Sequence, residues 1–284
     1  MTTTNTTWDP ERYLRFERQR GQAYRDLLAR LAPPVGAAGA WSPATIVDLG
    51  CGPGNTTALL PALWPDARAI GVDSSAQMIE AAEPRAVPGR LEFRRADLRE
   101  VTSEDLGGQV DLVITNATLQ WIPGHLDLFP RLADLLTPRG VIAVGVPGNF
   151  DSPTHTLLAD LQHEPRWSAR LSGLEVRPAV PEPTDYLRTL TEVGLRADVW
   201  ETTYLHVIEG EDGIFDFVSS TALRPVLAEL GGPDSPAARE FCDEYRKALR
   251  SAYPATQLGG KTAQLLPFRR IFALGYGPDH PEQL

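Results

Sequence analysis

The sequence predicts a doubly wound α/β fold, a mostly parallel sheet with helices on both faces, together with a helical cap. From residue 45 onward, short runs that are apolar throughout alternate with helical segments, which is typical of strands buried between two helical layers. A glycine-rich segment follows the first of these runs, where a strand would turn into a helix. Together these two observations indicate a Rossmann-like sheet.

The expected elements follow in chain order. Residues 8–31 predict an amphipathic helical lead-in, because aromatic and leucine side chains recur at helical spacing before a Gly/Ala/Pro connector. The short apolar runs predict strands at residues 45–49, 69–72, 91–94, 111–115 and 141–146. Helices are expected to begin near Asn55, Ser75 and His125.

After Pro147 the pattern is less regular. We expect a loose Pro-rich stretch over 165–183, then a helix at 185–193, a strand at 197–206, helices at 211–230 and 236–252, and a final strand at 268–276. These elements divide the chain into four segments. A helical lead-in that contributes to the cap covers residues 1–42, and the α/β core covers 43–206. A helical cap insertion covers 207–264, and a final core strand with its tail covers 265–284.

Bulk properties exclude several classes of function. A formal net charge of -10 works against binding to nucleic acid or anionic lipid, and no apolar run is long enough to cross a membrane. The N-terminus lacks a secretory signal, and Cys51 and Cys242 form neither a disulfide framework nor a metal-binding spacing. The histidines also lack ligand spacing, so we expect a cytoplasmic protein without a metal. The sequence does not determine the oligomeric state.

The strongest signal is the pattern Asp48-x-Gly50-x-Gly52-x-Gly54 between the first strand and the first helix. Glycines let the backbone turn sharply and approach a ligand closely. Asp73 ends the second strand, where a carboxylate can accept hydrogen bonds from both ribose hydroxyls of a nucleoside. The alternatives are a plain strand–helix turn for the glycines and a helix N-cap for Asp73.

A dinucleotide site, and with it nicotinamide-dependent oxidoreduction, would favour a third glycine where Asn55 stands. The pattern instead resembles the first motif of class I S-adenosylmethionine (SAM)-dependent methyltransferases. That resemblance implies SAM as cofactor and S-adenosylhomocysteine (SAH) as product. It places Asp97 near the adenine amino group, with a capping role as the alternative, and Asn116 near the methionine moiety. The cofactor-binding residues it implies are Asp48, Gly50, Cys51, Gly52, Gly54, Asn55, Asp73, Ser74, Met78, Ala96, Asp97, Leu98, Asn116 and Leu119.

A closer resemblance, to the trans-aconitate 2-methyltransferase family, covers nearly the whole chain. It is carried by Trp8-Asp9-Pro10-x-x-Tyr13 and the Arg20 region, the glycine-rich turn, Gly71-Val72-Asp73-Ser74-Ser75, Asn116-Ala117-x-Leu119-Gln120-Trp121, Leu223-Arg224-Pro225-Val226-Leu227 and Leu265-Leu266-Pro267-Phe268-Arg269-Arg270. The resemblance implies monomethyl esterification of a small polycarboxylic acid, most simply trans-aconitate.

The chemistry of such an acceptor needs no catalytic residue. A carboxylate, with a pKa of about 4, is already ionised at neutral pH and can attack a sulfonium methyl without a general base. The enzyme would align the reactants, exclude water, and bind the other carboxylates with Arg. The substrate-binding candidates are Arg224, Arg269, Arg20, Tyr13, Tyr245, Tyr253, Gln120 and Trp121.

Each candidate has a structural alternative. An Arg can be a solvated surface residue, and Tyr245 shares a helical stripe with Phe241 and Leu249 that suits a cap core. Arg269 and Arg270 are adjacent on a strand and point to opposite faces, so at most one faces a pocket. Two alternative functions stay open: methylation of another small acid or natural product, and SAM binding without catalysis.

Overall fold

The computed structural model describes residues 17–31, 41–174, 179–219 and 221–281, with the side chains of residues 17–20 outside the description. The chain forms two compact units. We call Arg18–Pro147, Val180–Thr202 and Arg270–Leu284 the sheet unit, and Gly148–Ala179 with Thr203–Arg269 the helical unit. Two long strands, β6 (Arg196–Glu209) and β8 (Lys261–Tyr276), each begin in one unit and end in the other.

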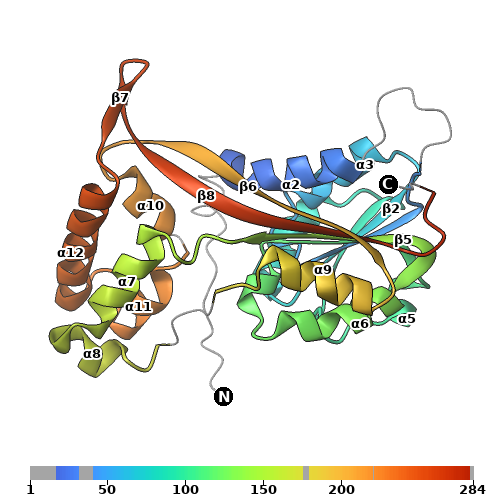
Figure 1. The fold of residues 1–284 in the computed structure, drawn as a ribbon, viewed down its shortest axis with the longest axis horizontal. Coiled ribbons are helices and arrows are strands. Elements are labelled where there is room, and N and C mark those ends of the chain that lie inside the picture. The colour runs from blue at the N-terminus through green and yellow to red at the C-terminus, as the bar shows by residue number, and fades with distance from the viewer. Residues whose placement is uncertain (1–16, 32–40, 175–178, 220, 282–284) are drawn as a thin grey trace. The chain divides into compact units, whose positions relative to one another are not determined.

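A single sheet with the strand order β3-β2-β1-β4-β5-β8-β6 organises the fold, and β7 pairs with β8 (Figure 1). Its strands are β1 (Thr45–Leu49), β2 (Arg68–Asp73), β3 (Leu91–Arg95), β4 (Val110–Asn116), β5 (Leu136–Pro147), β6 (Arg196–Glu209), β7 (Thr256–Leu258) and β8 (Lys261–Tyr276). The first five strands are parallel, and β8 runs antiparallel to β5. Chain order reverses between β1 and β4, which confirms the predicted doubly wound fold.

Helices cover both faces of the parallel strands. Figure 1 shows α2 (Glu17–Leu31) and α3 (Leu60–Leu63) on one face, and α5 (Ser103–Leu106), α6 (Phe129–Asp134) and α9 (Pro183–Glu192) on the other. The remaining elements of this unit are short: η1 (Thr57–Leu59), α4 (Ala76–Ala82), η2 (Glu83–Arg85), η3 (Leu119–Trp121) and η4 (His125–Leu128). This arrangement explains why β1 and β4 are buried along almost their whole length.

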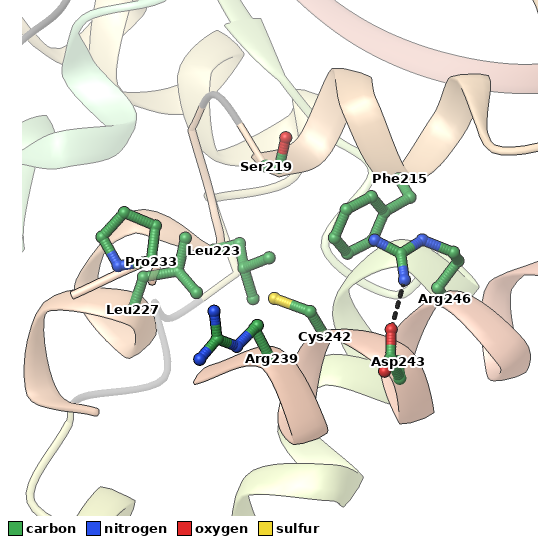
Figure 2. A pocket seen from close by; sticks show the side chains of 9 residues that line it. All are labelled: Phe215, Ser219, Leu223, Leu227, Pro233, Arg239, Cys242, Asp243 and Arg246. Carbon is green, nitrogen blue, oxygen red and sulfur yellow. Dashed lines mark hydrogen bonds and ion pairs between the residues drawn. The ribbon is translucent and has the colours of Figure 1, made fainter. Parts of the chain in front are cut away.

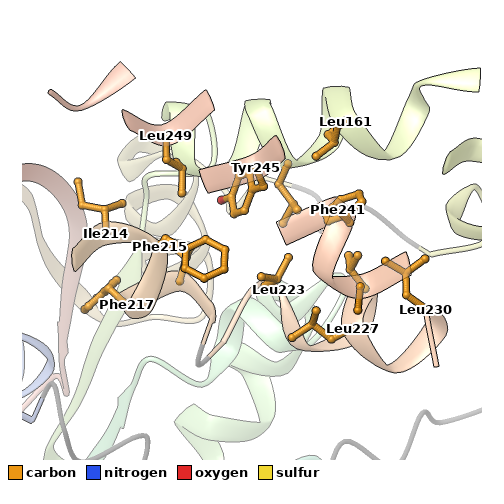
Figure 3. Packing of buried hydrophobic residues seen from close by; sticks show 14 of the residues in the cluster. Leu161, Ile214, Phe215, Phe217, Leu223, Leu227, Leu230, Phe241, Tyr245 and Leu249 are labelled. Atoms are coloured by element: carbon orange, nitrogen blue, oxygen red, sulfur yellow. The ribbon is translucent and has the colours of Figure 1, made fainter. Parts of the chain in front are cut away.

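The helical unit contains α7 (Pro153–His163), α8 (Pro165–Leu171), α10 (Gly213–Ser219), α11 (Arg224–Glu229) and α12 (Pro236–Ala252). These helices enclose a hydrophobic core of their own (Figure 3). On α12, Phe241, Tyr245 and Leu249 are almost completely buried, and the ring of Trp167 from α8 meets Phe241 edge-on at 5.3 Å between centroids. The apolar stripe predicted on 236–252 therefore forms part of this core.

The structure corrects the expectations for the region after Pro147. The loose stretch expected over 165–183 contains α8, because Pro165 occupies the first turn of a helix, where its missing N–H costs nothing. The single helix expected at 211–230 is two helices, and Pro225 stands in the first turn of the second, α11. The compact units also differ from the expected segments: residues 148–179 group with the helical unit rather than with the α/β core.

Candidate cofactor and acceptor site

Gly50 begins the turn after β1 and has a left-handed backbone, with φ 80°. A Cβ at this position would lie 2.2 Å from the side chain of Thr118, whose hydroxyl donates to the Gly50 carbonyl at 3.2 Å. The Gly50 amide donates to the Val72 carbonyl of β2 at 2.7 Å. The turn is therefore packed tightly between the ends of three parallel strands, β1, β2 and β4, and Gly50 is required by this packing.

Gly52 differs from Gly50 because its missing side chain leaves open space. Its φ is 56°, and a Cβ built there would meet no atom within 4 Å among the described residues beyond its chain neighbours. The backbone at the top of the turn is thus accessible to a ligand, at the carboxyl ends of the parallel strands where α/β sheets bind nucleotides. This opening meets the requirement for close approach that the sequence pattern predicts.

Asp73 ties this turn to the end of β2. Its Oδ2 accepts a hydrogen bond from the Gly52 amide at 3.0 Å, and its Oδ1 accepts one from the Ser75 amide at 2.8 Å. Ser75, not Asp73, is the N-cap of α4, because the Ser75 hydroxyl accepts from the Met78 amide. Burial raises the pKa of the Asp73 carboxyl. Each carboxylate oxygen keeps a second lone pair for a ligand hydroxyl.

Asp48 lies beneath the turn and is only 2% exposed. Its Oδ2 accepts hydrogen bonds from the Thr57 hydroxyl at 2.6 Å and the Tyr24 hydroxyl at 3.2 Å. Burial raises the pKa of Asp48 to about 6. We therefore assign Asp48 to supporting the turn from below rather than to lining a ligand surface. The sequence does not indicate this network, because Tyr24 and Asp48 are 24 residues apart in the chain.

Asp97 follows β3 and is paired with a cation. The Arg99 guanidinium donates to both carboxylate oxygens, with Nε 3.0 Å from each, and the Arg99 amide adds a bond of 2.9 Å to Oδ1. These bonds hold the pKa of Asp97 below its ordinary value. Asp97 is thus held as an ionised acceptor beyond the third strand, in the place that sequence analysis expected, and the pairing with Arg99 is a feature that the sequence did not indicate.

The loop after β4 contains the clearest strain in the described chain. Ala117 has a left-handed backbone, with φ 56°, which costs an alanine about 1 kcal/mol or more. Its amide donates to the Gly145 carbonyl at 2.7 Å, and Gln120 Nε2 donates to the Ala117 carbonyl at 2.7 Å. Asn116 Oδ1 and Gln120 Oε1 are buried and lack hydrogen-bond partners among the described residues. Strain and unsatisfied polar atoms together are typical of a ligand site.

The other predicted cofactor residues differ in exposure. Met78, Leu98, Leu119, Cys51 and Gly54 are buried, whereas Asn55 and Ala96 are half-buried and Ser74 is exposed. The Cys51 thiol donates to the Gly52 carbonyl at 3.5 Å, and burial raises its pKa well above the ordinary range. Cys51 is therefore a packing residue and not a nucleophile.

The acceptor candidates are spread over both units. Gln120 and the exposed Trp121 belong to the sheet unit, whereas Arg224, Arg269, Tyr245 and Tyr253 belong to the helical unit. Arg20 lies in α2, but its side chain is outside the described residues, as is the whole of Tyr13.

Within the helical unit, the two tyrosines are buried. Tyr245 donates its hydroxyl proton to the Thr154 carbonyl at 2.6 Å, so it serves the core rather than a substrate, and burial raises its pKa. Burial likewise raises the pKa of Tyr253. Arg224 and Arg269 are half-buried, and Arg269 donates to the Gly148 carbonyl at 3.3 Å.

A separate cavity of about 200 Å³ lies within the helical unit (Figure 2). Its walls include Leu223, Leu227 and Cys242, and its cations are Arg239 and Arg246. Arg246 is paired with Asp243 at 2.6 Å and covers the ring of Phe215 at 4.2 Å from its centroid. None of the predicted SAM or acceptor residues lines this cavity. Among the described residues there is also no cluster that could hold a metal ion and no helix long and apolar enough to cross a membrane.

Comparison with known proteins identifies the class first. A family model described as a methyltransferase domain matches residues 46–140, which include the glycine-rich turn, Asp73 and β4. Among solved structures, the YcgJ protein from Bacillus subtilis shares the fold with a TM-score of 0.54 and 13% identity over 90% of this chain and 99% of that one. The plantazolicin methyltransferase BpumL in complex with SAH has a TM-score of 0.51 and 15% identity over 94% and 90%. The chain therefore contains a methyltransferase domain and has the fold of class I methyltransferases, a class whose methyl donor is SAM.

Sequence relatives then narrow the assignment. A trans-aconitate 2-methyltransferase of Streptomyces avermitilis is 48% identical over 275 residues, which cover 95% of this chain and 97% of the relative. One of Rhodococcus jostii is 40% identical over 94% of this chain and 98% of the relative. The protein belongs to the trans-aconitate 2-methyltransferase family.

Proposed function

We propose that this enzyme transfers the methyl group of SAM to one carboxylate of trans-aconitate and forms its monomethyl ester. The observation that carries the choice of acceptor is the 48% identity, over nearly the whole of both chains, to a relative named trans-aconitate 2-methyltransferase. The turn geometry supports the choice of cofactor, because the open space above Gly52 and the carboxylate of Asp73 lie together at the nucleotide end of the sheet.

The residues present fit a sulfonium nucleoside. Asp73 would accept from the ribose hydroxyls, Gly52 would admit the cofactor close to the backbone, and Asp97 would stand near the adenine amino group. Asn116 Oδ1 and Gln120 Oε1 offer buried acceptors in the loop after β4. When bound there, SAM would supply an electrophilic methyl group on a positively charged sulfur.

The protein's own contribution is binding, orientation and exclusion of water. An acceptor carboxylate is already ionised at neutral pH, so no side chain needs to remove a proton. The half-buried Arg224 and Arg269 of the helical unit are proposed to bind acceptor carboxylates.

The proposal is tested by incubating the full chain with SAM carrying a labelled methyl group and a panel of acceptors. The panel contains trans-aconitate, other small di- and tricarboxylates, and neutral phenols, and mass spectrometry detects the gain of one methyl. We expect a methyl ester of trans-aconitate that alkali hydrolyses. Turnover of phenols alone would refute the assignment, and turnover of a different acid alone would support the first alternative acceptor class.

A matched pair of variants separates catalysis from binding. Arg224→Ala should raise KM for trans-aconitate while calorimetry finds the affinity for SAH unchanged, because the residue is proposed to contact the acceptor and not the cofactor. Arg188→Ala, an exposed residue of α9 paired with Asp185, serves as the control for loss of a surface charge. Tight SAH binding without transfer to any acceptor would instead establish a SAM-binding protein without catalysis.

We also place the enzyme in the cytoplasm. Cys51 and Cys242 do not form a disulfide, which suits a reducing compartment. Fractionation of the native host, with detection of the protein in the membrane-free cytosolic fraction, tests this placement.

A further inference from the structure

Arg270 is a buried cation on β8 within the sheet unit, and its side chain is among the least exposed of the charged groups, at 5% for the residue. Of the adjacent pair, it is Arg270 that is buried, whereas Arg269 is half-buried. A guanidinium shielded from water attracts a carboxylate more strongly than one on the surface, because screening by solvent is weaker there.

The sheet register places Arg270 on the same face as Asn116. Arg270 pairs with Pro147, Phe272 pairs with Gly145, and Gly145 pairs with Asn116. Directly paired residues present their side chains to one face, and residues two apart on a strand share that face. Asn116 Oδ1 would lie 2.5 Å from a Cβ on Gly145, so its amide extends over the glycine toward β8.

The spacing suits a small acid. Asn116 and Arg270 are two strands and two residues apart, which separates their Cα atoms by about 12 Å. An extended arginine side chain covers a large part of this span, and a small polycarboxylate can cover the remainder. The Asn116 end of the span lies in the strained loop that holds the buried, unsatisfied Asn116 Oδ1 and Gln120 Oε1 within the described chain.

We infer that Arg270 binds one of the non-reacting carboxylates of the acceptor, and so selects polycarboxylates over acids with fewer carboxylates. This inference rests on the proposed function and names a binding residue within the sheet unit. The carboxylate and the planar guanidinium can form two parallel hydrogen bonds, which fix the orientation of the acceptor as well as adding affinity.

The test combines a substitution at Arg270 with the removal of single carboxylates from the acceptor, as in a double-mutant cycle. kcat/KM is measured for wild type and Arg270→Met with trans-aconitate, and with mesaconate, cis-glutaconate and itaconate, which each lack a different one of its three carboxylates. Loss of a buried charge pair predicts a fall of about 100-fold on trans-aconitate. On the analogue without the carboxylate that Arg270 binds, the fall should be less than about threefold, because no pair remains to be lost. Equal losses on all four acids, or no loss on any, would overturn the inference.

Two controls exclude a merely structural effect. Arg196→Met removes a half-buried arginine that lies over the ring of Tyr276, at the C-terminal end of β8, and it should leave the preference among the acids unchanged. SAH affinity measured by calorimetry should be the same for wild type and Arg270→Met, which shows that the sheet unit is folded. Arg270→Lys keeps a cation if the Met variant fails to fold, and its loss must also be confined to acids that carry the relevant carboxylate.

Binding separates this inference from the proposed reaction. If wild type with SAH binds trans-aconitate but produces no ester, the proposed reaction fails, and weaker binding by Arg270→Met still supports the role of Arg270. If wild type produces the ester and the variant discriminates among the acids as wild type does, the proposed function stands and the inference about Arg270 is wrong. If wild type neither binds nor methylates trans-aconitate, both fail.

Discussion

The open space above Gly52 allows a direct test of the cofactor site with one added methyl group. Gly52→Ala places a Cβ more than 4 Å from other atoms of the described residues, its chain neighbours aside, so the substitution causes no steric clash among them. Its cost to folding comes from the backbone alone, because φ is 56°. A left-handed alanine costs roughly 1–2 kcal/mol, and the stiffer unfolded chain returns about 0.4–1 kcal/mol. The net loss of stability is therefore about 1 kcal/mol, or roughly 2–4 °C in Tm.

The effect on the binding of SAH should be at least as large as this cost to folding. The new methyl group would project from the top of the turn, where the cofactor must approach the backbone, and would also disturb the bond from the Gly52 amide to Asp73. We expect the Kd for SAH to rise at least about tenfold, which corresponds to about 1.4 kcal/mol. Isothermal titration calorimetry with SAH measures this change, and thermal unfolding without ligand measures the stability.

Gly89→Ala is the matched control. Gly89 has φ 73°, and a Cβ there also meets nothing within 4 Å, but the residue lies in the turn before β3, at the amino end of the strands. Both variants should lose similar stability, and only Gly52→Ala should lose affinity for SAH. If Gly52→Ala binds SAH as tightly as Gly89→Ala and wild type, then the opening above the turn does not receive the cofactor, and the assignment of the site is refuted.

Two further predictions concern stability. Burial raises the pKa of Asp48 to about 6, whereas an aspartate in the unfolded chain has a pKa of about 4. Between about pH 4 and pH 6 the folded protein therefore holds this proton more tightly than the unfolded chain does. As the pH rises through this range, the free energy of unfolding falls by roughly 3 kcal/mol in total. Asp48→Asn removes this decline, while its amide oxygen can still accept hydrogen bonds from Thr57 and Tyr24. Urea unfolding across this range should show that the stability of the variant increases relative to wild type as the pH rises. A constant difference in the free energy of unfolding would contradict the reasoning. Phe241→Ala empties a fully buried position in the core of the helical unit and should cost about 3–5 kcal/mol in urea unfolding, while a loss below about 1 kcal/mol would be incompatible with that burial.

Much of the fold follows from local signals in the sequence. The strand at 45–49 and the helix at 236–252 have the bounds expected from their patterns. A short apolar run and a capped amphipathic stripe are local signals, because each lies wholly within the segment that it predicts. Regions with mixed signals were predicted less well. The prolines near Pro165 predict loose structure, whereas Pro165 stands in the first turn of α8.

The candidate site divides in the same way. The sequence by itself determined the glycine-rich turn, the acidic residue after the second strand and the class of chemistry, since the backbone of the turn and the end of β2 impose particular residue types on short segments. Only the tertiary structure decided that Asp48 is held by Tyr24 and Thr57, that Tyr245 donates to Thr154, and that Arg270 shares a face with Asn116. Most of these pairings join residues far apart in the chain, and the choice among them depends on strand register and helix packing, which no short stretch of sequence contains.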